Sequence, residues 1–254
     1  MCLLLFSYRS HPRYKLVLAG NRDEFYERPT APAACWDDAP HIVAGRDLEK
    51  GGTWMGVTRN GRFAALTNYR SPEHNRPDAA SRGFLVSDYL RGDEPPASYL
   101  ALVQKNREHY NGFNLLVGDT DRLYYYSPLL NEIKEVAPGI HGVSNAVLDT
   151  PWPKVRKGVQ GMDAVMQQEK IQESELFAML ANAEQAPEEE LPDTGVGIEW
   201  ERTLSPLFIA SAGYGTRAMT VLTIDNDNNI MFTEKSLEPE TGKWEEARFC
   251  FTAG

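Results

Sequence analysis

The chain has 254 residues, of which 42% are hydrophobic and 24% charged, and this is the composition of an ordinary globular protein. Its net charge of −10 disfavours nucleic acid as a partner, because binding to phosphate backbones requires an excess of Lys and Arg. No apolar run is long enough for a transmembrane helix, and three cysteines without ligand spacing predict neither a disulfide framework nor a metal site. We therefore expect a soluble cytoplasmic protein.

Turn residues divide the first third of the chain into short runs with the composition of β-strands. The pair Asn60-Gly61 is a strong hairpin signal and lies between two of these runs. We expect strands at residues 2–8, 14–19, 53–58 and 62–67.

The middle of the chain combines two helices with a second hairpin. An apolar stripe predicts one helix that begins near Ser81 and stops at Gly92, and another helix follows Pro95-Pro96. Turn residues then separate further strand-like runs, which predicts a hairpin. We expect strands at residues 113–117, 123–127 and 133–136.

Two more helices precede a long loop. Apolar residues at helical spacing predict a helix over residues 155–166, and Ser174 is the expected N-cap of the next helix. Residues 184–203 are acidic and contain Pro and Gly, which is typical of an exposed surface loop. Strands are expected again at residues 218–224, 230–234 and 248–251.

These elements predict a single α+β domain over residues 1–254, because no linker or repeat divides the chain. Hairpins before and after two pairs of helices indicate two stacked antiparallel sheets with helices outside. The order of elements alone also allows a generic α+β fold.

Cys2 is the first candidate for chemistry. Removal of Met1 would leave a cysteine that carries both a thiol and a free α-amine. Such an amine has a pKa of about 7.7–8.0, so it can accept the thiol proton and leave the reactive thiolate. The alternative is a small apolar residue that begins a buried strand.

The segment Asn21-Arg22-Asp23-Glu24 places four polar residues where a strand runs into a turn. Asp23 is a candidate to orient the α-amine of Cys2, and Arg22 is a candidate to hold a carboxylate. The alternative for this segment is an ordinary hydrogen-bonded turn.

Other candidates lie in later polar motifs. Asn68 and Asn145 carry amides that suit an oxyanion or a substrate clamp, although asparagines in turns are often structural. Trp54 follows paired glycines, which permit close approach of a ligand. Arg46 lies in a polar segment that contains Gly45, and Arg217 directly precedes an expected strand, where it offers a guanidinium group.

Together these motifs resemble the NRDE family, which is named after residues 21–24 and includes the animal transport-and-Golgi-organisation-2 proteins. The resemblance covers nearly the whole chain. The family is similar to N-terminal-nucleophile amidases such as choloylglycine hydrolases and penicillin V acylases, which implies a four-layer αββα sandwich.

Residue by residue, the resemblance implies that Cys2 is the nucleophile and that Asp23 lies near its amine. It also implies that Asn68, Asn145 and Arg217 are active-site residues. The chain departs from the amidases at Gly20, where they carry an arginine, so hydrolysis does not follow from the motifs alone.

Two functions from different classes remain open. The resemblance implies ligand handling in haem trafficking, or acyl-coenzyme A binding in lipid homeostasis. The ligand is then a small amphipathic anion held by Asn21, Arg22, Glu24, Arg46 and Trp54, with Arg217 as a further anchor. No cofactor is required, and if haem is carried, its axial ligand is Cys2, His41, His141 or a methionine. The alternative is a cysteine amidohydrolase or thioesterase that uses Cys2.

Overall fold

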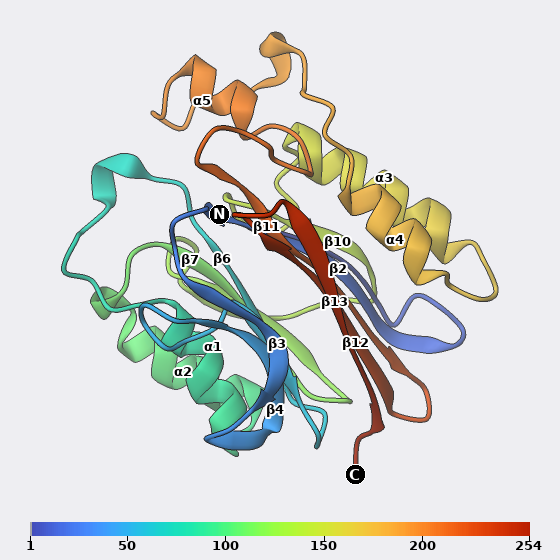
Figure 1. Cartoon of the computed structure of the whole chain (residues 1–254). Coiled ribbons are helices and arrows are strands. Elements are labelled where there is room, and N and C mark those ends of the chain that lie inside the picture. Colours follow the sequence, from blue (N-terminus) through green and yellow to red (C-terminus); the bar gives the residue numbers. More distant parts are fainter. Residues whose placement is uncertain (1) are drawn as a thin grey trace.

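The computed structural model describes residues 2–254, which form two stacked antiparallel sheets with helices on both outer sides (Figure 1). The first sheet has the strand order β10 (Gly139–Val143), β1 (Cys2–Tyr8), β2 (Tyr14–Phe25), β11 (Tyr214–Asp225), β12 (Asn229–Glu238) and β13 (Lys243–Thr252). The second has the order β3 (Thr30–Trp36), β4 (Ala39–Asp47), β5 (Met55–Thr58), β6 (Phe63–Asn68), β7 (Phe113–Gly118), β8 (Leu123–Ser127) and β9 (Glu132–Glu135).

Each sheet has its own pair of covering helices. The helices α1 (Gly83–Arg91) and α2 (Pro96–Lys105) pack on the second sheet, and α3 (Pro153–Met166) and α4 (Glu173–Leu180) pack on the first. The predicted four-layer αββα sandwich is therefore confirmed. The remaining helical segments are α5 (Ile198–Thr203), η1 (Pro72–His74), η2 (Arg107–His109) and η3 (Glu188–Glu190).

Strand β1 shows how the sequence builds the layers. Successive side chains of a strand point to opposite faces, so its apolar residues serve two cores. Cys2 and Leu4 pack between the two sheets, whereas Leu3 and Leu5 pack beneath α3 and α4. A continuous apolar run is therefore needed, because both faces of this strand are buried.

The hairpin predicted at Asn60-Gly61 is present between β5 and β6, and Gly61 adopts the positive φ of 83° that its turn requires. Strands β3 and β4 were not predicted from the sequence. Their residues are mostly Ala, Pro and charged types, which have low strand propensity, and two register shifts interrupt their pairing. Strand β10 was also missed because two of its five residues are Gly.

Two sequence predictions about helices need correction. Ser174 is not an N-cap, since α4 begins at Glu173 and its cap position is Gln172. Residues 184–197 are mostly exposed and irregular as predicted, but the stretch then forms α5, in which Glu201 is only 3% exposed. None of the helices within residues 2–254 combines the length and the apolar character needed to cross a membrane.

Candidate functional site

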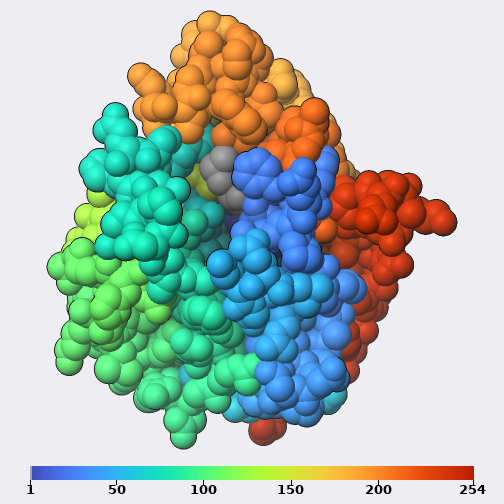
Figure 2. Space-filling view, turned by 60° about the vertical axis from the view of Figure 1, so that its left-hand side comes forward, coloured from blue at the N-terminus to red at the C-terminus, as the bar shows by residue number. Residues whose placement is uncertain are grey.

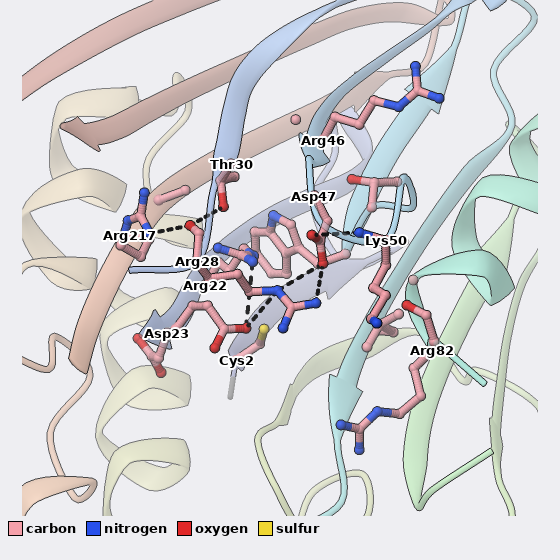
Figure 3. A pocket seen from close by; sticks show the side chains of 18 of the residues that line it. Cys2, Arg22, Asp23, Arg28, Thr30, Arg46, Asp47, Lys50, Arg82 and Arg217 are labelled. Carbon is pink, nitrogen blue, oxygen red and sulfur yellow. Dashed lines mark hydrogen bonds and ion pairs between the residues drawn. The ribbon is translucent and has the colours of Figure 1, made fainter. Parts of the chain in front are cut away.

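A cavity of about 550 Å³ opens at one end of the space between the two sheets (Figure 3). Its walls come from segments far apart in the sequence, including the start of β1, the ends of β2 and β12, and the segment before α1. Figure 2 shows the segments near residues 25, 75 and 200 (blue, teal and orange) meeting at this end of the molecule. The two-sheet architecture therefore brings remote polar motifs together.

Cys2 lies at the first position of β1 and is 6% exposed. It pairs across the sheet with Arg22 of β2, so both side chains face the same side and both line the cavity. The pKa of the Cys2 thiol is raised to about 11, mainly by burial; the nearby Asp23 carboxylate contributes to this rise, and the positive charge of Arg22 opposes it. In this environment the thiol is protonated at neutral pH.

Asp23 lines the cavity next to Cys2 and is 1% exposed. The pairing of β2 with β11 sets it opposite Thr216, whose hydroxyl donates a hydrogen bond of 2.7 Å to Oδ1 of Asp23. Burial raises the pKa of Asp23, while the positive charge of Lys154 lowers it. Asp23 is thus an acid whose ionisation depends on nearby cations.

The two asparagines occupy different depths. Asn68 lines the cavity at the end of β6. Asn145 does not line it: its amide lies behind that wall and donates a hydrogen bond of 2.8 Å to the backbone oxygen of Asn68. The adjacent Ser144 hydroxyl donates to the backbone oxygen of Cys2 over 3.3 Å. Asn145 therefore supports the wall formed by Asn68 and Cys2.

Arg217 lines the cavity on β11, and its side chain joins β11 to the turn after β2. Its Nη1 donates hydrogen bonds to the backbone oxygens of Phe25, Tyr26 and Arg28 over 3.1, 3.2 and 2.9 Å. Carbonyl oxygens do not neutralise the guanidinium charge. The charge of Arg217 thus remains available to an anion.

Arg22 is 7% exposed, and its Nη2 lies 3.6 Å from a carboxylate oxygen of Glu24, which also lines the cavity. Nη1 of Arg22 is buried and has no hydrogen-bond partner among residues 2–254. A buried N–H without a partner is costly and is therefore a candidate for ligand contact.

Of the predicted ligand contacts, Asn21 lies outside the cavity, whereas Arg46 lines it with its guanidinium already paired. Asn21 points to the opposite face of β2, where its amide donates to the backbone oxygens of Leu180 and Leu207 over 3.0 and 2.8 Å. The alternation of side chains along a strand explains why Asn21 and Arg22 face different layers. Arg46 borders the cavity, but its guanidinium pairs with Asp38 over 2.7 Å and stacks on Trp36. Figure 3 shows it directed away from Cys2.

The remaining prediction, Trp54, lies in the cavity wall and is 7% exposed. Sequence reasoning missed other charged residues there. Arg28 forms a 2.7 Å ion pair with Asp47, and Arg82 donates a 3.0 Å hydrogen bond to the backbone oxygen of Gly112. The sequence feature that could have identified Arg82 as a candidate is its position directly before α1. The predicted axial ligand His141 is engaged elsewhere, with Asp149 and the backbone oxygen of Ala137.

Comparisons with known proteins agree with these motifs. The model of the family described as "Transport and Golgi organisation 2" matches residues 1–239. The Transport and Golgi organization 2 homolog of Mus musculus is 36% identical over 99% of each chain. The Transport and Golgi organization protein 2 of Drosophila melanogaster is 31% identical over 96% of this chain and 95% of that one.

A solved structure extends the likeness at the level of fold. The C2A mutant of the conjugated bile acid hydrolase from Clostridium perfringens aligns over 100% of this chain and 98% of its own, with a TM-score of 0.51 and 8% identity. At this identity the likeness shows a shared fold alone.

Proposed function

Because the chain belongs to the Transport and Golgi organisation 2 family and has the fold of N-terminal-nucleophile hydrolases, we propose that it is a ligand-handling protein whose cavity binds a small amphipathic anion. The ligand class is acyl-coenzyme A, with a role in lipid homeostasis, or haem, with a role in haem trafficking. A cytoplasmic location is part of the proposal. It is supported by three unpaired cysteines, Cys2, Cys35 and Cys250, as is usual in a reducing compartment.

The observation that carries the proposal is a set of arginines in the cavity wall that form no ion pair within the described chain, although carboxylates also line that wall. Among residues 2–254, the wall residues Arg76, Arg82 and Arg217 take part in no salt bridge. Burial lowers the pKa of Arg82 and of Arg217, so each guanidinium charge is unfavourable where it stands. A bound carboxylate or phosphate would relieve that cost and receive charge-assisted hydrogen bonds.

The same wall offers apolar surface. Trp54, Leu66 and Leu237 line the cavity together with the arginines. Its volume of about 550 Å³ is in the range of small-molecule sites. An apolar wall beside guanidinium groups suits a ligand with a hydrocarbon part and an anionic head.

The geometry favours acyl-coenzyme A over haem held by an axial bond. The cavity wall, as far as the structure describes it, contains no His or Met, and the thiol of Cys2 has a pKa raised to about 11 by burial. Polar contacts to haem would then be made through its propionates alone. A coenzyme A thioester presents several phosphates to the arginines and does not require an axial ligand.

A second candidate function is hydrolysis of an amide or thioester with Cys2 as nucleophile. The observation in its favour is that Cys2, Asp23 and Asn68 line one cavity in a chain with this fold. The free α-amine of a processed Cys2 would supply the base. Met1 lies outside the described residues, so its removal stays a prediction.

The two functions are separated by one pair of experiments on wild-type protein and Cys2→Ser. Calorimetric titration with a long-chain acyl-coenzyme A, coenzyme A, a fatty acid and haem measures binding. We expect the acyl-coenzyme A to bind, and coenzyme A or the fatty acid alone to bind more weakly. Cys2→Ser should retain this affinity. Absence of saturable binding by every ligand would reject the proposal.

A panel of acyl amides and acyl thioesters measures turnover under the same conditions. Ligand handling predicts no turnover that depends on the thiol. Turnover on the order of one per second that disappears in Cys2→Ser would establish the hydrolase instead.

A further inference from the structure

Lys154, the second residue of α3, is a buried charged side chain outside the cavity wall. It is 2% exposed, and its Nζ has no hydrogen-bond partner among residues 2–254. The N-terminal end of a helix carries partial positive charge, which further disfavours an ammonium group there. A buried ammonium group without a hydrogen-bond partner is costly, so its presence calls for a function.

The surroundings of Lys154 connect it to the predicted nucleophile. The charged and titratable groups that act on its Nζ are Asp23 of β2, Arg70 after β6, Cys2 of β1 and Glu201 of α5. Burial lowers the pKa of Lys154 to about 8, while Asp23 opposes that shift. Asp23 in turn accepts a hydrogen bond from Thr216 and feels the charge of Arg22.

Lys154 is absent from the residues that line the cavity. It comes from α3, which packs on the outer face of the first sheet, whereas the Cys2 side chain packs between the sheets. Lys154 therefore does not meet a ligand in the cavity. Any influence on chemistry must pass through Asp23 and Cys2.

We infer that Lys154 is a positioning residue that supplies the counter-charge of Asp23 and thereby keeps an α-amine at Cys2 neutral. This inference deepens the hydrolase candidate and rests on removal of Met1. Without Lys154, the buried Asp23 carboxylate would draw its counter-charge from the amine, which would then stay protonated. With Lys154 in place, a second cation is repelled and the amine is free to act as a base.

The proton balance of the step is simple. The neutral amine takes the thiol proton, and the thiolate forms a bond to the acyl carbon. The bond from that carbon to the leaving amine or thiol breaks, and the proton on the α-amine passes to the leaving group. The step requires an amine that is unprotonated at working pH, which is the condition that Lys154 provides.

The test is the pKa of the α-amine, measured from the pH dependence of its acetylation by acetic anhydride with peptide mass spectrometry. The background is Cys2→Ser, so that no thiol competes for the reagent, and intact mass verifies that Met1 is absent. Lys154→Met is compared with Lys154→Arg, which keeps the charge. Lys157→Met on the same helix is the matched control, because Lys157 is more exposed and pairs with Glu184.

We expect Lys154→Met to raise the pKa of the amine by about one unit or more, and Lys154→Arg and Lys157→Met to leave it unchanged. An unchanged pKa in Lys154→Met would overturn the inference. If Lys154→Met does not fold, the single variant Asp23→Asn is compared with the double variant Asp23→Asn/Lys154→Met. Neither of these variants contains a buried Asp23 carboxylate that lacks its counter-charge. The double variant should then have the higher amine pKa, and equal values would also overturn the inference.

Labelling does not require turnover, so failure of the hydrolase function is seen separately. A raised amine pKa in Lys154→Met would support the electrostatic effect of Lys154 on the amine. If wild-type protein at the same time turns over no acyl substrate, the hydrolase function is rejected.

Discussion

At the scale of single residues, the cavity is defined by buried charges that lack full compensation. Arg22 is the sharpest case, because it lies opposite Cys2 and carries a buried N–H without a partner in the described chain. Such groups reduce stability and are retained where they serve a ligand. This gives Arg22 a signature that a purely structural arginine would not have.

We predict opposite effects of Arg22→Met on stability and on binding. The free energy of unfolding of the unliganded protein should be unchanged or higher, because a costly buried guanidinium is removed while Glu24 keeps Arg28 nearby, at 3.9 Å. Acyl-coenzyme A affinity should fall by about 1.5–3 kcal/mol, the value of a hydrogen bond to a charged group. Urea denaturation and calorimetry measure the two quantities.

Arg156→Met is the control for this prediction, since Arg156 lies on α3 and pairs with Glu190 at the surface. It should change neither quantity by more than about 0.5 kcal/mol. If Arg22→Met lowered the free energy of unfolding and left acyl-coenzyme A affinity unaltered, the role of Arg22 would be structural and not in ligand binding.

The reactivity of Cys2 should follow its raised pKa. With a pKa of about 11, the thiolate fraction of the 254-residue chain increases about tenfold for each pH unit from 7 to 10. Iodoacetamide alkylation followed by peptide mass spectrometry should show this slope, with the exposed Cys250 as the internal reference. Alkylation of Cys2 at pH 7 as fast as that of Cys250 would contradict the assigned environment.

The sequence located several wall residues because they stand in dense polar motifs. Cys2, Asp23, Asn68 and Arg217 all line the cavity. Asn21 was predicted to contact the ligand but lies on the opposite face of β2, because a polar tetrapeptide does not indicate which strand face each side chain occupies. Lys154 was missed because lysines on helices are usually exposed, and only packing reveals a buried one.

At the scale of elements, α5 is held by a buried ion pair. Nη1 of Arg70, which follows β6, lies 2.6 Å from Oε2 of Glu201, and both side chains are at most 5% exposed. Oε1 of Glu201 also accepts hydrogen bonds from the backbone and hydroxyl of Thr194. One carboxylate therefore joins α5, the preceding loop and the second sheet.

We predict that Glu201→Gln lowers the free energy of unfolding by about 3–5 kcal/mol, because it leaves the buried Arg70 without its carboxylate. Hydrogen exchange should accelerate first in residues 193–203. Glu199→Gln is the control: its side chain is 81% exposed and its pairing with Arg202 contributes about 0–1 kcal/mol. Equal effects of the two substitutions would show that the buried pair does not hold α5.

Elements with strong local signals were predicted and the others were not. The Asn60-Gly61 hairpin is encoded by turn chemistry, whereas β3 and β4 depend on tertiary contacts that local composition does not contain. One such contact is the 2.7 Å hydrogen bond from the backbone N–H of Ala33 to the buried carboxylate of Glu234 on β12. A contact between residues more than 200 positions apart cannot be predicted from a short segment of sequence.

At the scale of the whole molecule, the stacking of two sheets creates the cavity. The order of predicted elements allowed this sandwich and a generic α+β fold alike, so the layering followed only from the family resemblance. The set of side chains that line the cavity depends on the same layering, because β1, β2, β6 and β11 each contribute residues to its wall. Function in this protein is thus a property of the assembled sheets.

Ligand binding should stabilise the whole fold. A ligand that binds only the native state raises the free energy of unfolding by RT ln(1 + [L]/Kd), which is about 2.7 kcal/mol at a hundredfold excess over Kd. Thermal denaturation should therefore show a Tm that increases with acyl-coenzyme A concentration. The increase should be smaller in Arg82→Gln, and a Tm independent of ligand in both proteins would contradict specific binding.

An anionic amphipathic ligand should bind in the cavity between the sheets. Hydrogen exchange with and without saturating long-chain acyl-coenzyme A tests this binding most directly, because the cavity wall is spread over separate peptides. A ligand in the cavity should slow exchange in residues 22–32, 45–54 and 76–83, which contribute to that wall, with little change in residues 123–135 of β8 and β9. Slower exchange confined to segments outside the cavity would contradict binding there.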